Sequence, residues 1–120
     1  MMWSEKFNKA LIEMQKCGDV YAEAKSQSWF LQEMCSVMKS SLIEKALSEN
    51  PKLSQVRAEC VARSSKEYIV HLDGTKVAIE LELKSKCRYE KAVNTFEACR
   101  SLVSLDKKLE GKSGSEKENQ

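Results

Sequence analysis

The sequence predicts an all-α protein: an elongated, coiled-coil-like helical hairpin in which a short connecting helix joins two long helices. Three observations lead to this fold class. Charged residues make up 32% and hydrophobic residues 42% of the 120-residue chain, a balance typical of helix-rich proteins. Four glycines and one proline are few for a sheet protein, which needs frequent turn residues. The third observation is a hydrophobic repeat averaging 3.5 residues in the first third of the chain.

This repeat predicts one long helix over about residues 3–48. Eleven of its twelve positions are apolar or aromatic and only Ser28 is polar. The helix should end before Asn50-Pro51, because the residue before a proline is pushed out of the helical region. About 46 residues at 1.5 Å each make a rod of roughly 70 Å. The positions are Trp3, Phe7, Ala10, Met14, Cys17, Tyr21, Ala24, Ser28, Leu31, Cys35, Met38 and Leu42.

A rod of this length cannot bury its apolar stripe alone, so the sequence predicts a homodimer or higher oligomer. Trp29, Phe30, Met34 and Val37 widen the stripe in the second half of the helix. The expected interface residues are Trp3, Phe7, Met14, Trp29, Leu31 and Met38.

A short connecting helix is expected after Pro51, which is favourably placed near a helix start. Ser64 and Glu67 have the spacing of a capping box, in which a serine caps a new helix and a glutamate reaches back to it. The sequence therefore predicts a second helix start at Ser64.

The segment 68–83 is open to two interpretations. Asp73-Gly74 favours a tight turn and lies between residues 68–72 and a segment in which Val77, Ile79, Leu81 and Leu83 alternate with other residues, which suits a small β-hairpin. An isolated hairpin is only marginally stable, however, and helical spacing from Ala78 through Leu81 and Ser85 to Val103 favours a helix with a break near Asp73-Gly74. We expect the last long helix over about 75–109, a single domain over 1–110 and a disordered polar tail over 111–120.

No motif for catalysis, a metal or a cofactor is evident. The five cysteines include no closely spaced pair of the kind that zinc sites use, and His71 is the sole histidine. The glycines are isolated, so no phosphate-binding loop can be drawn. We therefore expect no enzyme and no cofactor. No apolar run is long enough to span a membrane and no signal peptide is apparent, so a cytoplasmic protein is expected.

The charges are unevenly distributed along the chain. The net charge is −1 over residues 1–50, +3 over 51–66 and +4 over 84–112. If the last two segments lie together, they form a basic strip that can follow a phosphate backbone. The candidate nucleic-acid-binding residues are Arg57, Arg63, Lys66, Lys84, Arg88 and Lys91.

Two short patterns resemble known proteins. Arg88-Tyr89-Glu90-x-Ala92 with Glu97-x-x-Arg100 resembles the C-terminal helix of small helical phage and prophage proteins. Ala62-Arg63 with Lys66-Glu67-Tyr68 resembles the central part of recombination mediators of the UvsY type. The resemblance implies a non-enzymatic, oligomeric DNA recombination or replication accessory protein that binds single-stranded DNA and helps to load a recombinase. The alternative is a coiled-coil adaptor or scaffold that binds a protein partner and no nucleic acid.

Overall fold

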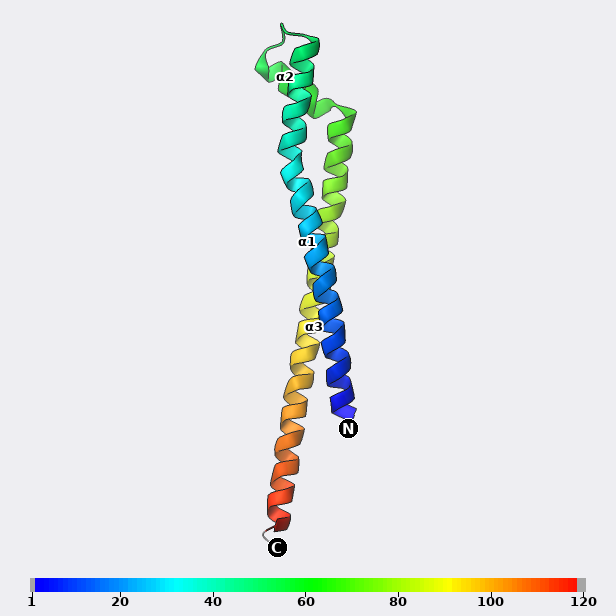
Figure 1. The fold of residues 1–120 in the computed structure, drawn as a ribbon, viewed down its shortest axis with the longest axis vertical. Coiled ribbons are helices and arrows are strands. Elements are labelled where there is room, and N and C mark those ends of the chain that lie inside the picture. The colour runs from blue at the N-terminus through cyan, green and yellow to red at the C-terminus, as the bar shows by residue number, and fades with distance from the viewer. Residues whose placement is uncertain (1, 119–120) are drawn as a thin grey trace. The chain divides into compact units, whose positions relative to one another are not determined.

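The computed structural model describes the backbone of residues 2–118 and the side chains of residues 3–111. Three helices account for nearly all of this part of the chain: α1 (Met2–Glu49), α2 (Gln55–Ser64) and α3 (Lys66–Glu118) (Figure 1). No strand occurs among the described residues. The predicted all-α class, with two long helices and a short connecting one, is confirmed, and the alternative β-hairpin over 68–83 is wrong because α3 runs through that segment.

α1 ends where the sequence indicates, because Asn50 closes the helix and turns the chain. The Asn50 amide still donates to the carbonyl of Ala46 at 3.0 Å, and the Asn50 carbonyl then accepts from the Leu53 amide at 3.1 Å. The Asn50 side chain accepts from the Lys52 amide at 3.3 Å. Ser54 then caps α2, since its hydroxyl accepts from the Arg57 amide at 3.2 Å.

The helix start predicted at Ser64 lies one residue later in the structure, and it is the start of α3 itself, which therefore begins about nine residues before the last long helix expected from about residue 75. Ser65 has an extended backbone (φ −64°, ψ 144°), and its hydroxyl accepts from the Tyr68 amide at 3.2 Å. Ser64 is the last residue of α2, and its hydroxyl donates back to the Cys60 carbonyl. The predicted capping box of Ser64 and Glu67 is therefore wrong, because Ser65 is the capping residue and Tyr68 occupies the third helical position.

α3 has no break at Asp73-Gly74. None of the described glycines has a positive φ, and a Cβ on Gly74 would meet nothing within 4 Å. An exposed glycine costs a helix about 1 kcal/mol relative to alanine, which a long helix tolerates.

α3 also continues past the predicted end near Leu109 to Glu118, through much of the predicted polar tail. Lysine and glutamate in this stretch are good helix formers. Residues 119–120 of that tail lie outside the described residues.

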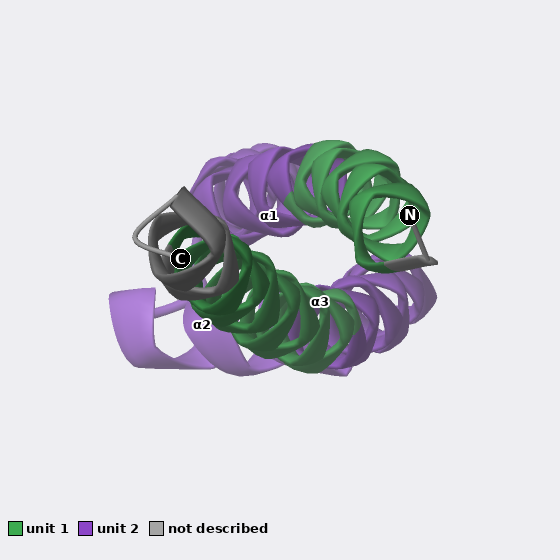
Figure 2. Ribbon diagram, turned by 90° about the horizontal axis from the view of Figure 1, so that it is seen from below, with its two compact units in different colours: residues 1–21, 85–120 green, residues 22–84 purple. Residues whose placement is uncertain are grey.

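The contacts group the chain into two compact units. Unit 1 contains residues 1–21 and 85–120, and unit 2 contains residues 22–84 (Figure 2). In unit 1 the helices are antiparallel: the rings of Phe7 and Phe96 lie 5.1 Å apart and those of Tyr21 and Tyr89 lie 6.0 Å apart. Tyr89 also packs on Gly18, where an added Cβ would approach its Cε1 to 3.4 Å.

Unit 2 pairs the second half of α1 with the first part of α3, also antiparallel. Lys45 lies 3.9 Å from the Glu67 carboxylate. One turn further along α3, His71 Nε2 donates to the Leu31 carbonyl at 3.0 Å. α2 belongs to the same unit and buries Ala58 and Ala62 completely or nearly so.

The predicted stripe of α1 is confirmed, because all twelve of its positions are buried or half-buried. Its one polar member, Ser28, is completely buried and accepts from Gln32 Nε2 at 2.9 Å. On α3 the stripe contains Glu82 rather than Leu81, which is 48% exposed. We call the buried line where the stripes of α1 and α3 meet the seam. Leu42 is the one large side chain among its buried residues. The other buried residues of the seam are small: Ala10, Ala24, Ser28, Ala46, Thr75, Ala78, Ser85 and Ala92.

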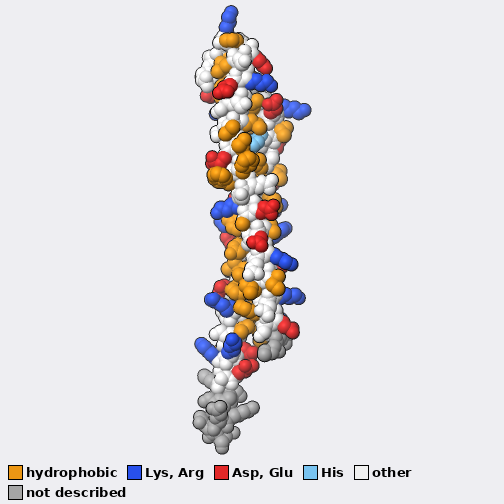
Figure 3. All heavy atoms as spheres, viewed as in Figure 1, with side chains coloured by type: hydrophobic (Ala, Val, Ile, Leu, Met, Phe, Trp, Pro, Cys, Tyr) orange, Lys and Arg blue, Asp and Glu red, His pale blue; other side chains and the backbone are white. Residues whose placement is uncertain are grey.

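Because small side chains fill the seam, larger apolar side chains remain at the surface. Many larger apolar side chains of both helices lie outside the seam and are exposed, as Figure 3 shows by the hydrophobic atoms between the charged ones. Within the described residues no helix is apolar over enough length to cross a membrane.

Candidate nucleic-acid interface

The six basic residues expected to bind nucleic acid are all exposed, but they are divided between the two units. Arg57 and Arg63 lie on α2, and Lys66 and Lys84 lie on α3, all within unit 2. Arg88 and Lys91 belong to unit 1. The structure therefore does not gather the six residues in one unit.

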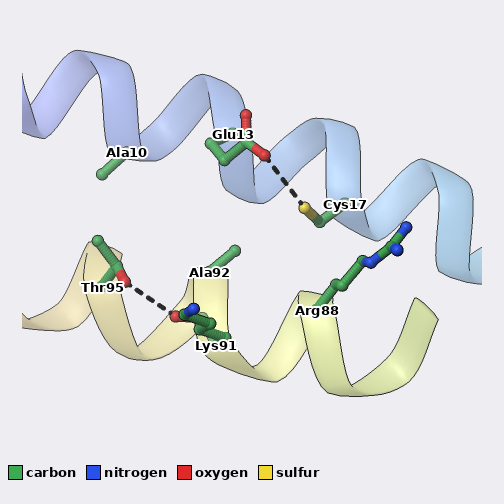
Figure 4. Close-up of a pocket in the computed structure, with 7 residues that line it drawn as sticks. All are labelled: Ala10, Glu13, Cys17, Arg88, Lys91, Ala92 and Thr95. Atoms are coloured by element: carbon green, nitrogen blue, oxygen red, sulfur yellow. Dashed lines mark hydrogen bonds between the residues drawn. The ribbon is translucent and has the colours of Figure 1, made fainter. Parts of the chain in front are cut away.

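A shallow groove in unit 1 contains Arg88 and Lys91. It has a volume of about 280 Å³ and lies between α1 and α3 (Figure 4). Its floor contains the small side chains of Ala10 and Ala92, which let the groove approach the helix backbones. Arg88 extends from α3 toward α1, as Figure 4 shows. The lining residues are Ala10, Glu13, Cys17, Arg88, Lys91, Ala92 and Thr95.

Three lysines of α1 extend this basic region. Lys6 and Lys9 line an adjoining hollow together with Glu13 and Thr95. Lys16 lines a second hollow together with Cys17 and Arg88. Because the three hollows share residues, they lie on one side of unit 1. We call this surface the cationic groove and define its basic residues as Lys6, Lys9, Lys16, Arg88 and Lys91.

Sequence reasoning missed the three lysines of α1 because residues 1–50 carry a net charge of −1 as a whole. A signal was nevertheless present. Lys9 and Lys16 are seven residues apart, so they lie on the same side of the apolar stripe, and Lys6 precedes Lys9 by three. Glu5 and Asp19, by contrast, fall at other helical positions.

Glu13 is the one carboxylate that lines these hollows, and it is engaged with Cys17. The Cys17 thiol donates to Glu13 Oε1 at 3.5 Å. Desolvation, together with this hydrogen bond and the negative charge of Glu13, raises the pKa of the Cys17 thiol, whereas Arg88 acts in the opposite direction. The thiol therefore stays protonated at neutral pH, a form that is a poor nucleophile.

The aromatic residues of unit 1 pack within the helix pair. Tyr89 is half-buried against Gly18 and Tyr21. Lys6 Nζ lies 4.7 Å from the centre of the Trp3 ring, a cation–π contact that keeps this ammonium group near the helix surface.

Most of the residues expected to form an oligomer interface contribute to the intramolecular seam. Trp3, Phe7, Met14, Leu31 and Met38 are all half-buried within a single chain. Trp29 differs, since 63% of its surface is exposed. Of the six expected residues, Trp29 is thus the one that a single copy leaves most available to a partner.

The structure brings together no cluster of metal-ligating side chains among the described residues. The five cysteines are free thiols; Cys17, Cys35 and Cys99 are half-buried, and Cys60 and Cys87 are exposed. No protein-family model matches the chain, and no curated protein or solved structure matches it either.

Proposed function

We propose that this chain is a non-enzymatic accessory protein of DNA recombination or replication that binds single-stranded DNA as an oligomer. The observation that carries the proposal is the cationic groove, whose three hollows are lined by five basic side chains from two helices and by a single carboxylate. The free thiols are consistent with the reducing environment of the cytoplasm, where we place the protein.

The groove suits a phosphate backbone better than a base. Its basic groups reach it from both helices, and its floor is formed by alanines that leave room for a chain to approach. Phosphate contacts are independent of sequence, and the aromatic rings nearby are held in the helix pair. We therefore expect binding with little base preference.

One protomer offers few contacts. Each phosphate contact on a single strand contributes about 0.7 to the slope of log affinity against log salt, so five contacts give a slope of about −3.5 at most. Such binding is weak at physiological salt. An oligomer that presents several grooves to one strand raises the affinity through effective concentration.

Fluorescence anisotropy with labelled oligo-dT tests the proposal at low and physiological salt. We expect the double variant Arg88→Glu/Lys91→Glu to lose most of the binding, because both changes replace an attraction with a repulsion inside the groove. Lys9→Glu/Lys16→Glu should have a comparable effect, which would show that α1 contributes to the same site.

The matched control is Lys107→Glu/Lys108→Glu, which changes the net charge equally on exposed positions of α3 that do not line the three hollows. The control should retain nearly all of the binding. Equal losses in the control and the groove variants would mean that net charge alone attracts the DNA. No binding by the native chain at low salt would refute the proposal.

The exposed apolar side chains of unit 2 favour a second candidate function, that of an adaptor or scaffold which binds a protein partner without nucleic acid. Val77 is 64% exposed and Phe30 is 55% exposed, and such side chains are usually covered in the working assembly. A native chain that binds no oligo-dT but captures a defined protein would establish this function instead.

A further inference from the structure

The residues that directly follow the seam residues of unit 2 form one side of its helix pair. In an antiparallel pair, such positions of one helix lie beside the equivalent positions of the other. Unit 1 shows this arrangement, because one hollow on its surface is lined by residues that directly follow stripe positions, namely Ser4, Asn8, Arg100 and Ser104. The same rule applies within residues 22–84, where α1 and α3 are also antiparallel.

Large apolar side chains dominate this side of unit 2. Trp29 is 63% exposed and Leu83 is 53% exposed, and Ile69 and Leu72 are exposed as well. From Ile69 to Leu83 this surface extends along α3 for about 21 Å, at 1.5 Å per residue. A helix of about 15 residues has the same length. The large apolar residues of this side are Trp29, Ile43, Ile69, Leu72, Ile79 and Leu83.

The charged residues of this side are all basic. Within residues 22–84, which the structure describes throughout, no acidic residue of α1 or α3 directly follows a seam residue. Glu33, Asp73 and Glu80 lie opposite the seam, on the outer surface of each helix. The lysines of this side are Lys25, Lys39 and Lys76. These lysines and the large apolar residues given above define what we call the basic face.

The opposite side of unit 2, formed by residues that directly precede the seam residues, is apolar too but has no net charge. Phe30 on this side is 55% exposed. Glu23 and Glu67 are balanced by Lys45 and Lys84, and Lys45 lies 3.9 Å from the Glu67 carboxylate. Charge therefore distinguishes the two sides, and the basic face alone favours a partner of one sign.

We infer that the basic face binds an acidic amphipathic helix of a partner protein. The apolar side of such a helix covers the exposed apolar residues, and its carboxylates meet the lysines beside them. The isoleucines and leucines around Trp29 favour a protein over single-stranded DNA, because they offer no aromatic ring to further bases. A second copy of this chain fits less well, because the opposite side of unit 2 has no excess of acidic residues.

This inference goes beyond the proposed DNA binding and does not depend on it. The basic face belongs to unit 2, whereas the basic residues of the cationic groove belong to unit 1. For the adaptor function, the inference specifies the chemistry of the partner. Peptide binding and DNA binding are measured separately, so a failure of one is distinct from a failure of the other.

The probe is a labelled synthetic peptide of about 15 residues, with leucines spaced three and four residues apart and glutamates on both sides of them. A matched peptide has lysine in place of each glutamate. Fluorescence anisotropy measures the binding of each peptide to the full chain. We expect the acidic peptide to bind at least about tenfold more tightly than the basic one, because like charges across an interface oppose binding.

The variant Lys39→Glu/Lys76→Glu should reverse this preference, so that the basic peptide binds more tightly. A reversal assigns the binding to the basic face, since a chain that failed to fold would lose both peptides. Circular dichroism verifies the fold of this and every other variant. A folded variant that keeps the native preference would overturn the inference.

The apolar part of the face is tested by two neighbouring aromatic residues. Trp29→Ala should weaken the binding of the acidic peptide by about tenfold or more, because an exposed tryptophan at the centre of an interface usually contributes most. Phe30→Ala is the matched control on the opposite side and should bind as the native chain does. Arg88→Glu/Lys91→Glu should also bind normally, which would show that the peptide does not occupy the cationic groove.

Tryptophan fluorescence locates the peptide directly. The chain has two tryptophans, so Trp3→Phe leaves Trp29 as the only one. Its emission should shift to shorter wavelength when the acidic peptide covers the ring. An emission that does not change while the peptide binds would place the peptide elsewhere and overturn the inference.

Other results would also contradict the acidic helix as occupant. Equal binding of the two peptides would show that charge does not select the partner. Equal losses for Trp29→Ala and Phe30→Ala would show that the basic face is not the site. A shift of Trp29 emission with phosphatidylglycerol vesicles or oligo-dT, but not with the acidic peptide, would make a lipid surface or DNA the occupant instead.

Discussion

Ser28 shows at the scale of one residue why the helices of unit 2 pack closely. It occupies a position where the 3.5-residue repeat would favour leucine, yet it is completely buried and bonded to Gln32. Its burial follows from its place in the repeat rather than from its polarity. The repeat therefore predicted the side chain's environment correctly, but the sequence carried no measure of the distance between the helices.

A leucine at this position should be harmful. We expect Ser28→Leu to lower the free energy of unfolding by about 1–3 kcal/mol, the usual cost of overpacking a seam. Ser28→Ala should change it by less than about 1 kcal/mol, since Gln32 is exposed and can bond to water instead. Urea unfolding measures both.

The control is Ser26→Leu on the exposed side of α1, which should be neutral because leucine favours helix there. A tolerated leucine at position 28 would contradict the close packing of the seam.

At the scale of the elements, the period of the apolar residues predicted the helices well and their ends less well. The long stripe fixed α1 as one helix, and Asn50-Pro51 fixed its end. The β-hairpin alternative failed because alternation of Val77, Ile79, Leu81 and Leu83 also fits a helix that exposes apolar residues on both flanks. Glu82 takes the seam position because the methylene groups of its side chain can lie on apolar surface while its carboxylate reaches water.

The start of α3 gives a prediction at this scale. Ser65→Ala should lower the free energy of unfolding by about 1 kcal/mol, since the hydroxyl that caps the Tyr68 amide is lost. The Ser65 hydroxyl also donates to the Ala62 carbonyl at 2.8 Å, and in the variant this carbonyl keeps only the Ser65 backbone amide, at 3.2 Å, as its donor.

Ser64→Ala is the matched control and should be nearly neutral, because the Ser64 hydroxyl only bonds back to a carbonyl of its own helix. Chemical denaturation compares the two. A larger loss for Ser64→Ala would restore Ser64 as the capping residue.

At the scale of the whole molecule, the candidate site is formed by basic residues of α1 and α3, which are far apart in the sequence. The net charges of the segments predicted basic residues of the site in 51–66 and 84–112. They predicted none in residues 1–50, whose net charge is −1. Arg88 and Lys91 were found in this way, whereas Lys9 and Lys16 required the pairing of α1 with α3. The same pairing turns Trp29 outward and the other expected interface residues inward.

The proposed self-association of the chain has a thermodynamic consequence. A partner that binds the folded chain but not the unfolded chain raises its stability by mass action. We therefore expect the melting temperature of the native chain to rise by about 2–5 °C for each tenfold increase in protein concentration. The Val37→Lys/Val77→Lys variant places two charges among the exposed apolar side chains of unit 2 and should not associate, so it should melt at one temperature at every concentration. Circular dichroism melts over a hundredfold range of concentration measure both. The control Val56→Lys changes an exposed apolar residue of α2 and is expected to follow the native chain. A native melting temperature that is independent of concentration would mean that a single copy is stable with its large apolar side chains in water.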